Sequence, residues 1–415
     1  MDMKSELFAA SRVSLSAALI FGMLVLPNPS TAAVKVGDTC KKIKQTRVIE
    51  GLMFTCVKAG KKQVWRRKGN APLPTSATPS PSASPSPEPT PTPTPTVVEI
   101  KAPTRFEDLF ENRKGIPRAA WQSIKKAIEG NERRDPQIEI HTGPNTKPWF
   151  EDYLYSAELV ARSFPNHGLP KKTIVIRFNY TDKDWADQKY QQEFTPEDRA
   201  FINRFEQGSI IQSDCDQATR DCRGARFSHS NSGNFLIALG VWNQLNPYDP
   251  AAEFTFKTGM VEAHEYFHGL QMAHMIGKSL REDNWPPAWF REGAAQWVEN
   301  AVINHADYEN YRKFIRIKCD SSCRSMSELD IIEFLTEARQ ERLPAKFARW
   351  LNYNMGAIIA ETLVAIKGHE SLVDMYREFG SGSEFAPAFK RIYGIDWTEA
   401  IPILAKTVHA QMQDL

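Results

Sequence analysis

The sequence predicts an α+β protein in which a lobe with a mixed or antiparallel sheet precedes a mainly helical C-terminal lobe. Strand-like runs occur at residues 137–141, 173–180 and 234–241, all in the first half of the main body of the chain. From about residue 256 onward the apolar residues recur almost entirely with helical spacing. A tract of Pro, Ser and Thr separates this body from a short cysteine-containing segment. Strands grouped ahead of helices are typical of an α+β domain, and 415 residues exceed one ordinary core.

The overall composition is that of an ordinary globular protein. Charged residues make up 25% of the chain, hydrophobic residues make up 41%, and the formal net charge is +2. This near balance gives no indication of a nucleic-acid partner.

The first 33 residues are organised like a secretory signal peptide. Lys4 and Arg12 precede an apolar run at residues 13–26, and small residues follow at 30–33. A membrane anchor is the alternative, but roughly 14 apolar residues fall short of the about 20 that span a bilayer. We therefore expect cleavage after Ala33, a secreted or cell-envelope-associated protein, and no transmembrane segment after cleavage.

The cysteines agree with an oxidising environment. There are six, and they form three local pairs: Cys40 with Cys56, Cys215 with Cys222, and Cys319 with Cys323. Such pairs in an exported protein are typical of disulfides that close short loops. Metal ligation by thiolates is the alternative, but no pair has the CxxC spacing of a zinc knuckle. Disulfides between nearest neighbours are the prediction, leaving no free thiol.

Residues 34–70 predict a small basic β module. Short strand-like runs at 47–49, 52–57 and 63–65 are separated by glycines, and a segment this small needs a disulfide to be stable. Eleven Lys and Arg face two acids between residues 34 and 69, which would suit contact with an anionic cell envelope. The alternative is that these charges only solvate a very small domain. Cys and Trp in this segment resemble small modules at the front of exported actinobacterial proteins.

Residues 71–100 predict a disordered linker. Proline occupies nearly every second position between residues 71 and 96, with Ser and Thr between, which favours a semi-rigid polyproline II spacer. The main body follows at residues 101–415. Besides the three strands, its predicted elements are helices at 105–129, 149–163, 345–366 and 398–412.

One predicted helix, VEAHEYFHGLQMAHMIGK at residues 261–278, carries the residues of a metal site. His264 and His268 are four positions apart, so on a helix they lie within about 40° of one another and both imidazoles can reach one ion. Glu265 is offset by about 100°, where a carboxylate can act on water without displacing it. This HExxH pattern is typical of zinc peptidases, and the alternative is a pair of surface histidines.

A catalytic zinc site usually has three protein ligands, so a third ligand is needed. His274 has the spacing of the third metzincin histidine, but Gln271 stands where that pattern needs a glycine, and Gly269 is out of register. Glu292 is the other candidate. It lies near the start of a new helix after the prolines at 286–287, and the small residues that follow it permit close approach of a facing helix.

The spacing from HEYFH to the glutamate of WFREGAA resembles the zinc site of the gluzincin peptidases, which include thermolysin-like and neutral-aminopeptidase enzymes. The resemblance covers roughly residues 256–395 and implies a gluzincin-like catalytic body with Glu292 as the third ligand and His274 as a bystander. WLNYNMGAIIAETLVAIKG at 350–368 resembles the helix in which these peptidases carry a tyrosine followed by a glycine. It implies that Tyr353, with Gly356 after it, binds the oxygen of the tetrahedral intermediate.

The chain departs from the gluzincin pattern in two places. It has no counterpart of the GxMEN strand with which aminopeptidases hold a substrate N-terminus. Gln296 stands where thermolysin-like enzymes keep an aspartate that supports a ligand histidine, so the support of the histidines is an open question.

These features predict a zinc-dependent peptidase in which Zn²⁺ polarises the scissile carbonyl and Glu265 is the general base. The expected partner is a peptide or protein substrate, cleaved internally while it pairs with an edge strand at residues 235–241. The alternative is an envelope-associated binding protein whose zinc site is structural or inactive.

Overall fold

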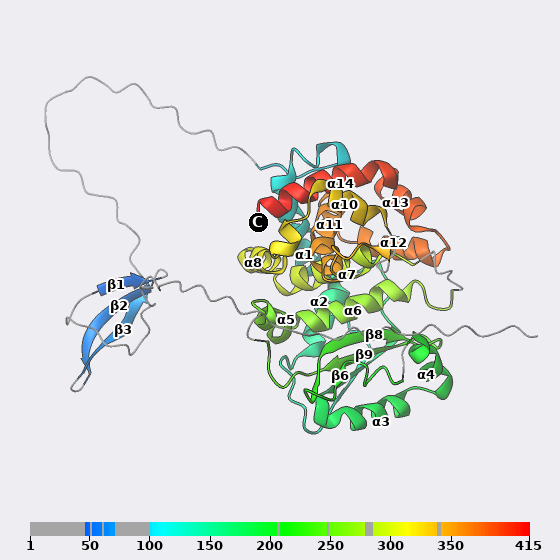
Figure 1. The fold of residues 1–415 in the computed structure, drawn as a ribbon, viewed down its shortest axis with the longest axis horizontal. Coiled ribbons are helices and arrows are strands. Elements are labelled where there is room, and N and C mark those ends of the chain that lie inside the picture. Colours follow the sequence, from blue (N-terminus) through cyan, green and yellow to red (C-terminus); the bar gives the residue numbers. More distant parts are fainter. Residues whose placement is uncertain are drawn as a thin grey trace, which may run out of the picture. The chain divides into compact units, whose positions relative to one another are not determined.

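The computed structural model describes residues 46–49, 52–59, 62–70, 100–205, 208–246, 249–278, 285–337 and 342–415. The chain divides into two compact units, Met1–Thr94 and Pro95–Leu415 (Figure 1). The predicted signal peptide at 1–33, nearly all of the predicted linker at 71–100, and Cys40 lie outside the described residues.

The first unit contains a three-stranded antiparallel sheet of order β1-β2-β3. Its strands are β1 (Thr46–Ile49), β2 (Leu52–Ala59) and β3 (Lys62–Asn70). This agrees with the three short strands predicted for the basic module. Cys56 in β2 is buried and disulfide-bonded.

The second unit contains a mixed four-stranded sheet of order β4-β5-β9-β8. Its strands are β4 (Ile138–Thr142), β5 (Lys172–Phe178), β8 (Gly224–His229) and β9 (Asn234–Gly240). The first three in spatial order run parallel, and β8 pairs antiparallel with β9. The strand predictions at 137–141, 173–180 and 234–241 are therefore confirmed to within two residues, and the mixed α+β class is confirmed.

The prediction that residues 235–241 form an edge strand is wrong. These residues belong to β9, which is hydrogen-bonded to β5 on one side and to β8 on the other. Backbone groups that are used on both sides cannot pair with a substrate. The edge on that side of the sheet is β8, which the sequence analysis missed.

Side chains on the two faces of the sheet pack against different helices because they alternate along each strand. Val175, Phe235 and Ile237 belong to the large core that includes helices α2 (Tyr153–Ser163) and α6 (Met260–Ala273). Ile174, Ile176 and Leu236 belong to a second core with α3 (Lys183–Glu193) and α4 (Pro196–Ile202). The sheet is therefore covered on both faces, with α6 and α3 on opposite sides (Figure 1).

Helices dominate the rest of the second unit, as predicted. The remaining α-helices are α1 (Ile116–Gly130), α5 (Ala252–Lys257), α7 (Ala288–Ile303), α8 (Tyr308–Lys318), α9 (Ser321–Arg324), α10 (Glu328–Thr336), α11 (Leu351–Lys367), α12 (Ser371–Gly380), α13 (Phe385–Tyr393) and α14 (Trp397–Gln413). Residues 105–115, predicted as the start of one long helix, contain only two short 3-10 turns. None of the helices that the structure describes combines the length and apolar character needed to cross a bilayer.

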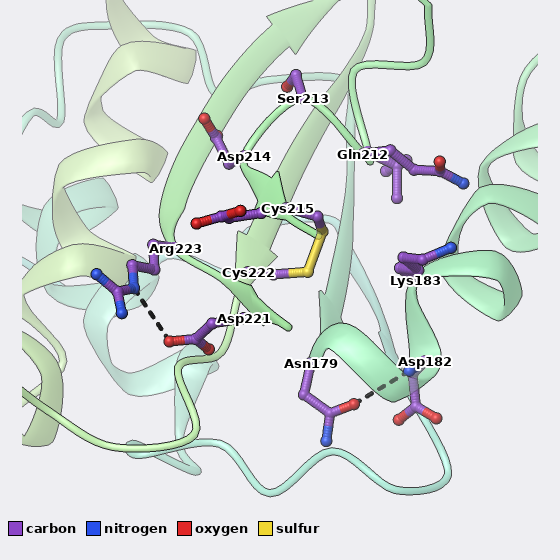
Figure 2. Close-up of a disulfide and its surroundings, with 12 residues drawn as sticks. Asn179, Asp182, Lys183, Gln212, Ser213, Asp214, Cys215, Asp221, Cys222 and Arg223 are labelled. Carbon is purple, nitrogen blue, oxygen red and sulfur yellow. Dashed lines mark hydrogen bonds and ion pairs between the residues drawn. A yellow bond between two sulfur atoms is a disulfide. The ribbon is translucent and has the colours of Figure 1, made fainter. Parts of the chain in front are cut away.

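Two disulfides lie in the second unit, and both join the predicted neighbours. Cys215 pairs with Cys222 across the short strands β6 (Cys215–Asp216) and β7 (Asp221–Cys222), and Cys319 pairs with Cys323. Figure 2 shows the first bond beside the ion pair between Asp221 and Arg223. Since Arg223 directly precedes β8, this disulfide fixes the beginning of the edge strand.

Candidate metal centre

The helix that carries HExxH is almost entirely buried. It starts after Gly259, whose φ of 92° lies in the left-handed region that favours glycine. Twelve residues of α6 are buried between the sheet and the helical lobe. Helix α7 starts after Pro287, whose fixed φ suits the entrance to a helix, and packs against α6. The two helices thereby bring His264 and His268 opposite Glu292.

Three ligand-type side chains converge at this contact. The Nε2 atoms of His264 and His268 lie 3.6 and 3.3 Å from the same oxygen, Oε2 of Glu292. The two imidazole rings are 4.8 Å apart and almost perpendicular. One ligand atom from each residue lies within 4.8 Å of the others, so all three could hold a single ion.

The other ring nitrogen of each histidine is held by a buried partner. Nδ1 of His264 lies 2.8 Å from Oε2 of Glu299, and Nδ1 of His268 lies 2.7 Å from Oε1 of Gln271. Gln271 also donates a hydrogen bond from Nε2 to the carbonyl of Arg291. Because an acceptor faces Nδ1 of each histidine, the ring proton resides on Nδ1 and Nε2 is left free to coordinate a metal.

These supports answer the question raised by Gln296. Its Nε2 donates to Asn354 rather than to a ligand histidine. The supporting carboxylate comes from Glu299, seven residues after Glu292 and therefore two turns farther along the same face of α7. Gln271, three residues after His268, is the position that lacks the metzincin glycine. The i, i+7 spacing of Glu292 and Glu299 and the i, i+3 spacing of His268 and Gln271 are the signals of these supports in the sequence.

The electrostatic field of the site favours a cation. Burial lowers the pKa of His264, but the carboxylates of Glu292 and Glu299 outweigh it and raise this pKa to about 10. Burial also favours the neutral form of Glu292, yet His268 and Arg291 hold its pKa well below the ordinary value. A site with two imidazole nitrogens and one ionised carboxylate has the donor set of a zinc site that leaves one position open.

Glu265 lies beside these residues and is not one of the three converging ligands. Its side chain is buried, and burial raises the pKa of its carboxyl against the opposing effect of His264 and His268. It makes no ion pair among the described residues, so its carboxyl group is not used to hold a neighbouring cation.

Tyr353 reaches the site from α11. Its ring stacks on His264 with centroids 5.9 Å apart, and the ring of the exposed Trp350 lies 5.5 Å from it. The approach of α11 depends on two glycines, because a Cβ on Gly293 would lie 2.3 Å from the backbone carbon of Gly356. Tyr353 thus lies at the site, whereas Gly356 lies at the contact between α11 and α7.

His274 is not part of the group of converging ligands. It is the C-cap residue of α6, and its Nε2 lies 3.2 Å from Nδ1 of His167. His167 in turn lies 3.7 Å from Asp374 on α12. His274 therefore joins α6 to neighbouring elements, in agreement with its predicted role as a bystander.

A second group of ligand-type side chains, Glu139, His141 and Glu193, lies at the outer end of the sheet. The ammonium of Lys172 is 2.7 Å from Glu139 and 3.7 Å from Glu193. Because this lysine already supplies a positive charge to both carboxylates, the group is an ion-pair cluster rather than a metal centre.

A scan against protein-family models, a search of curated proteins and a search of solved structures found no match for this chain. Its function therefore has to be inferred from the side chains of the site.

Proposed function

We propose that this chain is a zinc-dependent peptidase of gluzincin type that cleaves peptide bonds within extended chains. The observation that carries the proposal is the convergence of His264, His268 and Glu292 from two packed helices, with Glu265 buried beside them. His264, His268 and Glu292 would hold the metal. Bound Zn²⁺ would supply Lewis acidity, polarising the scissile carbonyl and lowering the pKa of water.

The residues of the chain would supply the remaining chemistry. Glu265 accepts a proton from the attacking water while the oxygen of that water bonds to the carbonyl carbon. The same carboxyl then returns that proton to the amide nitrogen as the C–N bond breaks, so the products are one carboxylic acid and one amine. Tyr353, whose ring stacks on that of His264, would donate a hydrogen bond to the oxygen that gains negative charge.

The edge strand β8 is the surface on which an extended substrate would pair. It passes the metal helix, since Phe227 lies 5.9 Å from the ring of His268. On its outer side β8 has no strand partner among the described residues. A peptide added there gains main-chain hydrogen bonds and runs past the site in both directions.

The composition of that strand favours internal cleavage. GARFSH, residues 224–229, contains no carboxylate that could hold a free α-amine. Acetylating the N-terminus of a peptide substrate should therefore leave its rate of cleavage nearly unchanged. An aminopeptidase would instead lose turnover on acetylation and would hydrolyse amino-acid amides well.

The N-terminal segments fit an extracellular role. The signal-like residues 1–33 would direct export, and the basic module at 34–70 would contact an anionic envelope. Lys and Arg to Gln substitutions in this module should then release the protein from anionic envelope fragments.

The test compares the zinc-loaded protein with Glu265→Gln. Both should bind one zinc per chain, but the variant should cleave casein or a peptide library at least about a hundred-fold more slowly. A protein that holds zinc and cleaves nothing, with or without Glu265, would support the alternative of a binding protein with a structural site.

A further inference from the structure

A pocket at the carboxyl ends of the parallel strands β5 and β9 lies next to the metal centre. Its walls include Arg177 from β5 and Val261 and Glu262 from the first turn of α6. Val261 is four residues, about one helical turn, before Glu265, so the two side chains lie on the same face of α6. The pocket is therefore next to the place where a substrate would meet Glu265.

Two facing glycines form part of the wall of this pocket. Gly224, the first residue of β8, pairs in register with Gly240, the last residue of β9, and both line the pocket. Gly224 has a φ of 120°, which side chains other than glycine rarely adopt. The disulfide at Cys222, two residues earlier, holds this corner in place (Figure 2).

Arg177 is a buried cation that makes no ion pair among the described residues, although Glu262 and Glu151 act on it electrostatically. It is 8% exposed, its Nε donates to Thr142, and its Nη1 donates to the carbonyls of Phe150 and Glu151. Nη2 has no hydrogen-bond acceptor among the described residues. A buried guanidinium that lacks a carboxylate partner is costly unless something else satisfies it.

Glu262 is the acidic side chain on the same pocket, and burial raises the pKa of its carboxyl to about 7. It is 6% exposed, and its Oε2 is buried with no hydrogen-bond partner. Arg177 is close enough to influence it electrostatically, yet no ion pair joins the two side chains, both of which the structure describes. One wall thus offers a free donor and the other offers a free acceptor.

We propose that this pocket binds the carboxamide of an asparagine or glutamine side chain next to the scissile bond. The amide oxygen would accept from Nη2 of Arg177, and the amide nitrogen would donate to Glu262. The ionised form of Glu262 would repel a carboxylate, Arg177 would repel an ammonium, and an apolar side chain would leave both groups unpaired. This inference deepens the proposed function, because it assigns a substrate preference to the same site.

The first experiment measures kcat/KM for peptides that differ at one residue next to the cleaved bond. Glutamine should exceed methionine, which has similar shape, by at least about ten-fold, and should also exceed glutamate and lysine. Glu262→Gln should reverse the order of glutamine and glutamate, because Arg177 and a new amide donor would then both face the substrate. Arg177→Met should abolish the preference for glutamine over methionine and over glutamate. Ratios of kcat/KM between peptides, measured within one variant, do not depend on the fraction of folded protein.

The second experiment separates this inference from the peptidase proposal. Calorimetry on the full, zinc-free chain titrates N-acetylglutamine amide and N-acetylmethionine amide, with Glu262→Gln for comparison. Binding of the glutamine compound alone, without cleavage of any peptide, would sustain the pocket and refute the peptidase. Peptide cleavage with equal rates for glutamine and methionine would refute the pocket, as would a strict requirement for a free α-amine held by Glu262.

Discussion

The support of His264 by Glu299 predicts a graded loss of zinc affinity. Glu299 is 4% exposed, and its Oε2 lies 2.8 Å from Nδ1 of His264. Glu299→Gln keeps an acceptor of the same shape but removes its charge, so we expect zinc affinity to fall about ten-fold. Glu299→Leu also removes the acceptor and should cost about a hundred-fold. These losses correspond to about 1.4 and 2.7 kcal/mol of binding free energy.

The assay is competition for zinc with a chromophoric chelator, with circular dichroism to verify that each variant is folded. Gln296→Leu is the matched control, since Gln296 is equally buried on the same helix but contacts Asn354. Its zinc affinity should stay within about two-fold of the parent. Unchanged affinity in both Glu299 variants, together with a ten-fold loss in Gln296→Leu, would refute the assignment of Glu299 as the supporting residue.

Three further predictions follow from the packing and burial of the second unit. His274→Ala should leave one zinc bound, whereas Glu292→Ala should lower bound zinc substantially; elemental analysis giving the opposite result would restore the metzincin arrangement. Gly356→Ala should lower the free energy of unfolding by more than about 2 kcal/mol, because its Cβ would lie 2.6 Å from the carbonyl oxygen of Trp289. Gly130→Ala, with no atom within 4 Å, should be neutral or stabilising in the same urea titration. Burial lowers the pKa of His167 from 6.5 to about 4, so the unfolded chain binds the extra proton and stability should fall from pH 6.5 to 4, by at most about 3 kcal/mol. Urea unfolding of chelator-treated protein should show a smaller loss in His167→Gln, and an equal loss would contradict this role.

Local sequence determined which segments form helices or strands and which residues could bind a metal or form a disulfide. Apolar runs located β4, β5 and β9, because buried parallel strands are nearly continuous apolar segments. Helical spacing placed His264 and His268 on one face, since four residues complete about one turn. Neighbouring cysteines predicted both disulfides of the second unit because a short loop brings its ends together in any fold.

Tertiary structure alone decided which elements became neighbours. Strand β8 was missed because GARFSH is short and mostly polar, with Ala225 and Phe227 as its only apolar side chains apart from glycine. Its insertion beside β9 turned an expected edge strand into an inner one. Arg177 and Glu262 are 85 positions apart, and only the packing of the sheet against α6 places them on one pocket. Periodicity fixes the face of a side chain within its own element, whereas the partner across an interface depends on how distant elements pack.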